Sequence, residues 1–379
     1  MATSMAASAP APEADALGKA PPPASLEDVR SLRDSLYASL QSMWRASTDE
    51  ESLQIAKNFV AEDAILDICA PVERLIGAQA FFQGYVAPVR AALQPRIQRR
   101  DDIFVGGVTR SNDRERDDPS TRDGVWIACT GHYMGNFEAA GLFGVPPAAD
   151  GRLVLLRYGE YYRVDVNTKK VVEAKIMVDL LDLALRAGHS IPLPHLLGTE
   201  YIYPPPATHD GVKPNGDVSL GAKSADLVEA MLFDLHAFDP NTFQSKNMTG
   251  KQGYWHEDMF WYGPAGIGAN FTYPGFDKHH RISFLTAFPD RKGGNHYCRI
   301  GDGDYVASSG WPSMTMTHAG DYLGVKATNK AMTCRVMDLW RCEDGQIMEN
   351  WVLLDLVHLF GQMGVDLIGG IKAADAATA

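Results

Sequence analysis

The sequence predicts an α+β protein built from a duplicated domain, and two observations carry this prediction. Residues 173–180 (EAKIMVDL) recur 176 positions later as residues 349–356 (ENWVLLDL), and each copy is an apolar run with one aspartate at the same place. Each half of the chain also opens with helix-patterned segments and closes with a run of strand-patterned ones. A repeat of this period is too long for a solenoid and indicates two copies of one domain.

The first half opens with helical spacing from residue 26, because Val29, Leu32 and Leu36 recur on one face, and Ser25 is a candidate N-cap. Its other predicted elements are helices over 49–59 and 77–93, and strands over 64–68, 102–109, 125–134, 153–164 and 171–180. The charged, Ser/Asn-rich stretch 110–123 is predicted to be a loop between two of these strands.

Prolines at 192, 194 and 204–206 mark a linker, after which the pattern repeats. The second half predicts helices over 224–238 and 278–288, and strands over 253–262, 296–300, 305–318, 331–341 and 347–355. This order indicates an α+β plan in which a curved sheet wraps helices on one face. The predicted organisation is a tail over 1–25, a first domain over 26–190, a linker over 191–223, a second domain over 224–368 and a tail over 369–379.

Composition excludes several classes of function. The 379 residues include 35 basic and 47 acidic side chains, and the net charge of -12 disfavours binding to nucleic acid. No run of eighteen apolar residues is present, so no membrane span is predicted. The N-terminus lacks the basic and apolar regions of a secretory signal, and the five scattered cysteines indicate reduced thiols, so the expected location is the cytoplasm.

Three motifs of the second half carry a family resemblance: WHEDMFWYGP at 255–264, THAGDYLG at 317–324, and WRCEDGQI at 340–347 followed by ENWVLLD at 349–355. Over roughly residues 225–366 the chain resembles the SnoaL-like polyketide cyclases, also called ester cyclases, of the nuclear transport factor 2 (NTF2)-like superfamily. The first half matches through GHYMG at 131–135, GVPP at 144–147 and YYR at 161–163. The resemblance implies two tandem NTF2-like cones, with curved antiparallel sheets wrapped around helices.

The resemblance also implies a catalytic residue. In the cyclases an aspartate near the end of the last strand acts as acid and base without a cofactor, and the matching position is Asp355. Trp351 and Leu353 share a strand face with Asp355, and their apolar groups would exclude water and raise the pKa of the carboxyl. The alternative is a structural aspartate that caps the following helix or binds an arginine. In the first copy Lys175 replaces the tryptophan, so Asp179 is predicted to be structural.

His256 and Asp258 share a face of the strand that opens the second cone and are candidate catalytic residues. The histidine could donate to an oxyanion or shuttle a proton, whereas the alternative is an exposed polar edge. His279 and His280 begin a helix and are predicted to lie at the surface. The histidines show no metal-ligand spacing, so no metal site is predicted.

Aromatic side chains are dense in the second domain, where they could line a pocket for a flat ligand or pack the core. The predicted ligand-binding residues of this kind are Trp261, Tyr262 and Trp340, together with Trp351 and Leu353 of the last strand. His318 precedes a turn and is a further candidate, with loop packing as its alternative.

The leading functional hypothesis is a cofactor-independent cyclase, isomerase or lyase that transfers a proton on a small carbonyl-containing, polyketide-like or aromatic molecule. The alternative is a non-catalytic small-molecule binder or an assembly module. The expected partners are a small-molecule substrate and, within the chain, the two cones paired as an internal pseudo-dimer, with a homo-oligomer left open. Neither nucleic acid nor membrane is expected as a partner.

Overall fold

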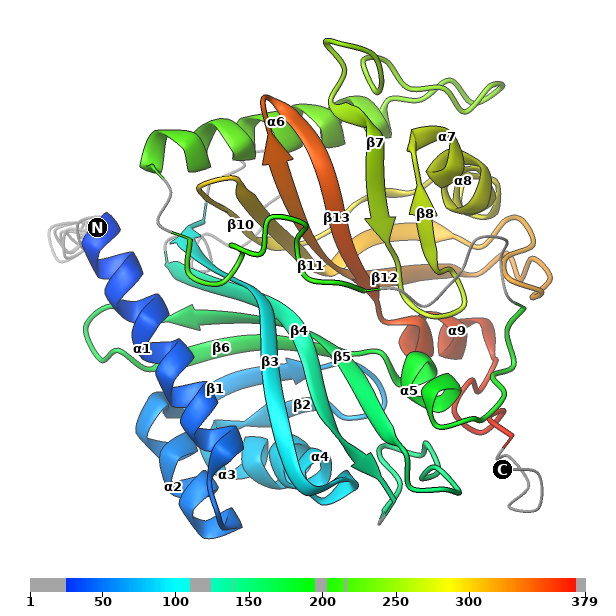
Figure 1. The fold of residues 1–379 in the computed structure, drawn as a ribbon. Helices are drawn as coiled ribbons and strands as arrows, with labels where there is room; N and C mark the ends of the chain where they lie inside the picture. The colour runs from blue at the N-terminus through cyan, green and yellow to red at the C-terminus, as the bar shows by residue number, and fades with distance from the viewer. Residues whose placement is uncertain (1–24, 110–123, 139, 195–202, 215–216, 373–379) are drawn as a thin grey trace, which may run out of the picture.

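The computed structural model of the chain describes residues 25–109, 124–138, 140–194, 203–214 and 217–372. Two sheets form the centre of the molecule, and helices lie on the outer side of each sheet (Figure 1). The first sheet has six strands in the order β2-β1-β6-β5-β4-β3, and the second has seven, in the order β10-β11-β12-β13-β7-β8 with β9 beside β11. The prediction of an α+β protein with two similar halves, each a sheet with helices packed on it, is confirmed.

The first sheet and its helices are formed by the first half of the chain. The strands are β1 Val60–Ile68, β2 Glu73–Ile76, β3 Leu93–Val108, β4 Val125–Phe137, β5 Leu153–Val164 and β6 Val171–Val178. The helices are α1 Leu26–Arg45, α2 Asp49–Phe59, α3 Gly77–Phe81, the π-helix η1 Phe82–Val86, α4 Ala87–Ala92 and α5 Leu180–Arg186. Ser25 caps α1 in a capping box with Asp28, as the sequence predicts.

The second half repeats this plan. Its strands are β7 Trp255–Tyr262, β8 Ala269–Phe271, β9 Lys292–Gly293, β10 His296–Asp302, β11 Tyr305–Thr317, β12 Ala331–Glu343 and β13 Gln346–Leu354. Its helices are α6 Val218–His236, α7 Tyr273–Phe276, the π-helix η3 Asp277–Arg281, α8 Ile282–Ala287 and α9 Leu356–Met363. A π-helical segment therefore interrupts the helix after the first strands in both halves.

The two sheets pack against each other through the faces that their own helices leave uncovered. The core of the first domain continues into Met337 and Leu339 of β12 and into Trp351 and Leu353 of β13. At Gly159 of β5, an added side-chain carbon would lie only 3.1 Å from Leu353 Cδ1, so the Leu353 side chain packs directly on the backbone of β5 there. This apolar interface is equivalent to the packing of two sheets in a sandwich.

Backbone pairing makes the two halves comparable position by position. The Asp179 amide donates to the Arg157 carbonyl over 3.1 Å, and the Asp355 amide donates to the Arg335 carbonyl over the same distance. The aspartates of the sequence repeat thus stand opposite an arginine on the neighbouring strand. Three residues beyond these arginines, Glu160 of β5 pairs with Ile176, and Asp338 of β12 pairs with Val352.

Several predicted bounds differ from the structure. The helix predicted from residue 224 begins at Val218, because Asp217 caps it and Gly221 lets the helix approach Gly301 closely. The short strands β2, β8 and β9 were not predicted, since two to four residues are too few for a periodic pattern. Within the described ranges, none of the helices is long and apolar enough to cross a membrane.

Candidate active site

A cavity of about 150 Å³ lies in the second domain, between the sheet and the helices α6, η3 and α8. A dry cavity of this volume is large enough for a single aromatic ring. Side chains alternate across a strand, so one face of β12 and β13 lines the cavity while the other face meets the first domain. The lining that bears on chemistry consists of Trp255, Trp261, His280, Asp338, Trp340 and Asn350.

Asp338 is the one acidic side chain among the residues that line this cavity. Its side chain is surrounded by protein atoms but remains partly exposed, because it borders the cavity. Burial raises the pKa of its carboxyl to about 7, and only the Asn350 amide, 3.5 Å away, opposes that rise. No basic side chain of the described residues forms an ion pair with it. Asp338 is therefore a carboxyl able to gain or lose a proton near neutral pH.

Asn350 holds its place through the backbone of the neighbouring strand. Its Nδ2 donates to the Leu339 carbonyl over 3.0 Å and also approaches Asp338 Oδ1. The amide is buried and comes from β13, where it faces the cavity together with Val352 and Leu354. A donor fixed in this way orients the carboxylate without supplying a charge that would lower its basicity much.

His280 lies on the opposite wall and was wrongly predicted to lie at the surface. Its ring stacks on Trp261 with the centroids 4.4 Å apart and an interplanar angle of 16°. Burial, and secondarily Arg291 and Arg281, lower the pKa of His280 to about 3, so the imidazole is neutral at physiological pH. The π-helix η3 contains this histidine and directs it inward (π-helical turns occur often at functional sites).

The equivalent interior of the first domain is filled with charged and phenolic side chains. Glu160, which corresponds to Asp338, accepts a hydrogen bond from Arg99 over 2.7 Å and another from Tyr162 over 2.8 Å. Tyr133 also donates to Glu160. All four side chains are buried, and Arg99 is bound again by Asp101 over 2.7 Å. This carboxylate is neutralised and enclosed.

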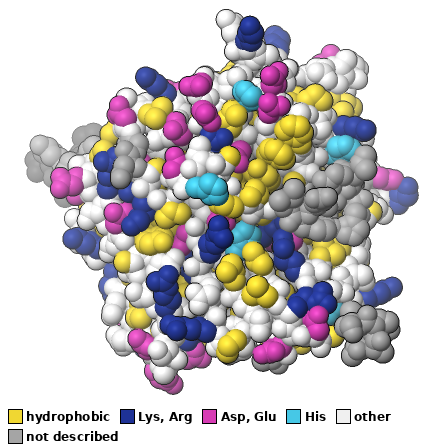
Figure 2. Space-filling view, in the orientation of Figure 1, with side chains coloured by type: hydrophobic (Ala, Val, Ile, Leu, Met, Phe, Trp, Pro, Cys, Tyr) yellow, Lys and Arg dark blue, Asp and Glu magenta, His cyan; other side chains and the backbone are white. Residues whose placement is uncertain are grey.

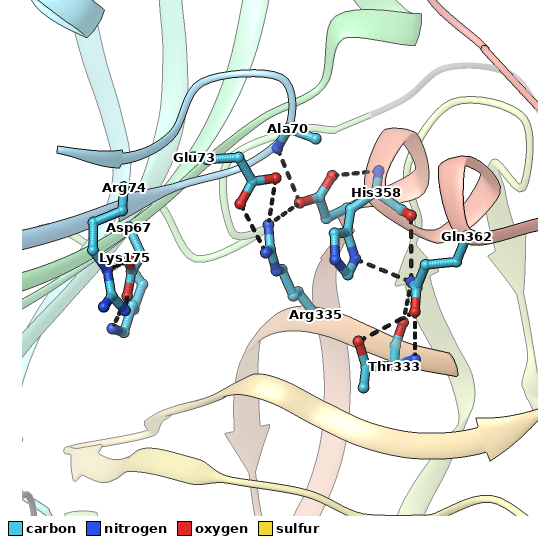
Figure 3. Close-up of polar contacts among 10 residues, drawn as sticks. Asp67, Ala70, Glu73, Arg74, Lys175, Thr333, Arg335, His358 and Gln362 are labelled. Carbon is cyan, nitrogen blue, oxygen red and sulfur yellow. Dashed lines mark hydrogen bonds and ion pairs between the residues drawn. The ribbon is translucent and has the colours of Figure 1, made fainter. Parts of the chain in front are cut away.

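The structure places Asp355 at the domain interface, not in the cavity. Its Oδ1 accepts the His358 amide over 3.0 Å and so caps α9, while Oδ2 binds Arg335 over 3.0 Å. Oδ2 also accepts the Ala70 amide of the first domain over 3.1 Å. Figure 3 shows Arg335 reaching between Glu73 of the first domain and the start of α9. Burial raises the pKa of Asp355 although Arg335 lowers it, and the structural alternative accounts for every contact.

Asp179 repeats this arrangement with the domains exchanged. It caps α5 by accepting the Asp182 amide over 2.9 Å, and it accepts the Ala265 amide of the second domain over 2.9 Å. Its cationic partner is Arg157, 3.5 Å away, and not the predicted Lys175. Lys175 instead binds Asp67 and Glu173. Four residues along a strand span about 13 Å, which is too far for the predicted pair.

Trp351, Leu353 and Tyr262 share the interface side of the second sheet. Trp351 is fully buried there, and its Nε1 donates to the Pro204 carbonyl over 2.8 Å. Tyr262 packs on Trp351 and donates to Glu349 over 3.1 Å. The prediction that Trp351, Leu353 and Asp355 lie on one side was sound in its geometry. That side meets the first domain, so none of them lines the cavity.

His256 and Asp258 also lie away from the cavity. Asp258 is exposed and His256 is half-buried, and their contact is a hydrogen bond from the Asp258 amide to His256 Nδ1 over 3.1 Å. They match the exposed polar edge weighed from the sequence. His318 is fully buried in loop packing, with Nδ1 beside Thr328 Oγ1 at 3.1 Å and its ring against Phe288.

Trp261 and Trp340 do line the cavity. Asp338, Asn350 and His280 were not identified from the sequence as residues that line the cavity. A signal for Asp338 was available: it is a lone acid inside the strand-patterned run 331–341, two residues before Trp340. No group of three or more potential metal ligands occurs among the described residues.

Residues 241–363 match the family model described as SnoaL-like polyketide cyclase, which confirms the resemblance found in the second half. No curated protein matches the chain. Among solved structures, IdmH, a putative polyketide cyclase from Streptomyces antibioticus, is 19% identical with a TM-score of 0.30, covering 38% of this chain and 99% of its own. A putative SnoaL-like polyketide cyclase from Jannaschia is 15% identical with a TM-score of 0.31, covering 40% and 98%.

Proposed function

We propose that the second domain, whose residues 241–363 match the SnoaL-like polyketide cyclases, is an acid–base catalyst of the cyclase or isomerase kind. Its substrate would be a small, flat molecule with a carbonyl group, and Asp338 would be its proton acceptor and donor. The observation that carries this proposal is a carboxyl in an aromatic cavity, with no cationic partner among the described residues and a pKa of about 7.

The proposed reaction begins when ionised Asp338 removes a proton from a carbon next to the substrate carbonyl. The electron pair of the C–H bond moves into the carbonyl and forms an enolate, while the proton stays on the Asp338 carboxyl. In ring closure the enolate carbon attacks a second carbonyl of the same molecule, and the new alkoxide takes the proton from the Asp338 carboxyl, which becomes ionised again. In isomerisation Asp338 returns its proton to a different carbon. A base with a pKa near the ambient pH suits both directions of transfer.

The other cavity residues would support the charge that develops. His280 is neutral, so it can donate an N–H to the enolate oxygen without forming an ion pair with Asp338 beforehand. Trp255, Trp261 and Trp340 present flat apolar surfaces that fit a planar molecule and exclude water. Excluding water keeps the carboxylate poorly solvated and therefore basic.

A generic carbon-acid probe tests this proposal without knowledge of the natural substrate. We expect the protein to accelerate ring opening of 5-nitrobenzisoxazole, a flat neutral compound that reacts by loss of one C–H proton to a base. The rate should rise with pH through about 7, as Asp338 ionises. Asp338→Asn should reduce the protein-dependent rate roughly 100-fold or more, in the range of general-base contributions.

Asp258→Asn is the matched control, since it removes an exposed carboxylate from the same domain and should leave the rate unchanged. An Asp338→Asn protein with the full rate would contradict the proposal. Binding of the probe with no acceleration by the wild-type protein would favour the alternative, a non-catalytic binder. The predicted domain bounds, the cytoplasmic location and the internal pairing as the state in solution stay predictions.

A further inference from the structure

Arg291 is a cation at the cavity that forms no ion pair with any residue that the structure describes. It lines the same cavity as Asp338, and its guanidinium lies over the Phe238 ring, 4.9 Å from the centroid. Its Nη1 is buried and has no hydrogen-bond partner among the described residues. An unpaired buried donor on a charged group is costly, so such a nitrogen in a binding cavity points to a missing ligand acceptor.

The neighbouring Arg281 also lines the cavity, and both of its terminal nitrogens have protein acceptors, although its buried Nε has none among the described residues. It binds Asp277 over 3.0 Å and Ser245 Oγ over 2.6 Å, and it donates to the Phe243 carbonyl. Arg281 therefore has protein acceptors and Arg291 has an unfilled position. Burial, together with the charge of Arg281, lowers the pKa of Arg291 to about 10, which leaves it protonated at neutral pH.

Asp338 does not fill that position. The hydrogen-bonding partner of its carboxyl is the Asn350 amide, and no hydrogen bond or ion pair joins Asp338 to Arg291. Within the described part of the chain, the cavity thus carries a cation and an acid that form no ion pair with each other or with another side chain. A ligand that reaches both must present an anionic group to one and a proton-donating carbon to the other.

We propose that Arg291 is the subsite for a carboxylate of the substrate, so that the molecule processed by Asp338 is a planar carboxylic acid. This inference rests on the proposed function for its catalytic part, but not for its binding part. A guanidinium matches a carboxylate because two parallel N–H groups face its two oxygens, and a buried pair of this kind excludes neutral analogues. Arg291 would then position the reacting carbon at Asp338.

Salicylate and salicylamide test the subsite, because they share one planar ring and differ in the charge of one group. Calorimetric titration of the wild-type protein should show tighter binding of salicylate. Arg291→Gln should weaken salicylate binding roughly 10- to 100-fold, the range expected for hydrogen bonds to a charged group, and leave salicylamide binding unchanged. The affinity of Arg291→Lys for salicylate should lie between those of the wild-type protein and Arg291→Gln. A lysine keeps the positive charge but lacks the two parallel N–H groups of the guanidinium.

Lys292→Gln is the matched control, because it removes the same charge from the next residue, which is exposed and does not line the cavity. Equal affinity of the wild-type protein for the two probes would overturn the inference, and so would equal weakening by Lys292→Gln. The neutral benzisoxazole probe separates the two proposals. Salicylate binding through Arg291 without benzisoxazole turnover would retain this inference and contradict the catalytic role of Asp338.

Discussion

Glu160 and Asp338 occupy the same position in the two halves of the molecule and differ in their surroundings. Both stand three residues beyond an arginine that faces a strand-end aspartate, and both point into the interior of their own domain. Glu160 is held by Arg99, Tyr133 and Tyr162, whereas Asp338 has one long contact to an amide and borders a cavity. One carboxylate serves as part of a packed interior and the other remains available.

From the sequence, Asp179 was contrasted with Asp355, whereas in the structure the two domains differ at Glu160 and Asp338. The aspartates of the sequence repeat, Asp179 and Asp355, are alike in function: each caps a helix and binds an arginine and an amide of the other domain. The two domains differ instead on the neighbouring strands, at Glu160 of β5 and Asp338 of β12. A duplicated carboxylate becomes structural when an arginine is supplied beside it, and becomes a candidate base when the arginine is absent.

The largest expected effect comes from removing the partner of the structural carboxylate. Arg99→Leu should lower the free energy of unfolding by about 3–5 kcal/mol, because it leaves the buried Glu160 charge uncompensated. Urea unfolding followed by circular dichroism measures this loss. The double variant Arg99→Leu with Glu160→Gln should recover most of it, and a single variant as stable as wild type would show that the pair is not needed.

Substitution of Asp338 should raise the free energy of unfolding at pH 8, where substitution of Arg99 lowers it. The folded-state pKa of Asp338, about 7, exceeds the value of 3.8 expected in the unfolded chain, so the folded protein retains a proton that the unfolded chain releases. This group therefore makes wild-type stability fall as pH rises from about 4 to about 7. Asp338→Asn should be more stable than wild type at pH 8 by roughly 2 kcal/mol, after a discount for partial exposure.

Unfolding of Asp338→Asn and wild type at several pH values checks this prediction. The difference should shrink as pH falls and vanish below about pH 3, where the wild-type carboxyl is protonated in both states. A variant that is less stable than wild type at pH 8 would indicate a partner for the carboxylate that the structure does not show.

The smallest effect is expected at the interface aspartates. Asp355→Asn should lower the unfolding free energy by about 1 kcal/mol, because Arg335 keeps Glu73 and an amide oxygen can still cap α9. Asp179→Asn should behave alike, since Arg157 keeps Asp182. Thermal melting measures both losses, and benzisoxazole turnover should persist in each. Loss of turnover by Asp355→Asn at an unchanged melting temperature would return the catalytic role to Asp355.

Much of the fold could be predicted from the sequence, because repeated apolar runs and glycine or proline boundaries are local signals. The range 153–164 matches β5 and 49–59 matches α2. The site was less accessible. Alternation along β13 shows that Trp351 and Leu353 share a face, but it does not say which face is turned toward the cavity. The sequence of the second domain alone is compatible with either face of β13 being turned toward the cavity. The packing of the first domain against Leu353 shows that the face with Trp351 and Leu353 is turned away from it.

His280 was missed for a related reason. Two adjacent histidines at a predicted helix start suggest a polar surface, but the π-helical turn rotates the chain so that one of them faces Trp261. Arg291 gave no periodic signal, since it follows α8 in a loop. On the visible face of Figure 2, charges of both signs are interspersed. The expectation that nucleic acid is not a partner stays a prediction.

The π-helical turns η1 and η3 place different side chains in the interiors of the two domains. Each spans five residues, and Tyr85 in the first corresponds by position to His280 in the second. A π-helical turn inside an α-helix is rare and often lies at a functional site. In the first domain the turn carries Tyr85, which is fully buried and packs on Phe81 and Trp44. In the second domain the same position carries His280, which lines the cavity, so one backbone feature supports a closed interior in one half and an open one in the other.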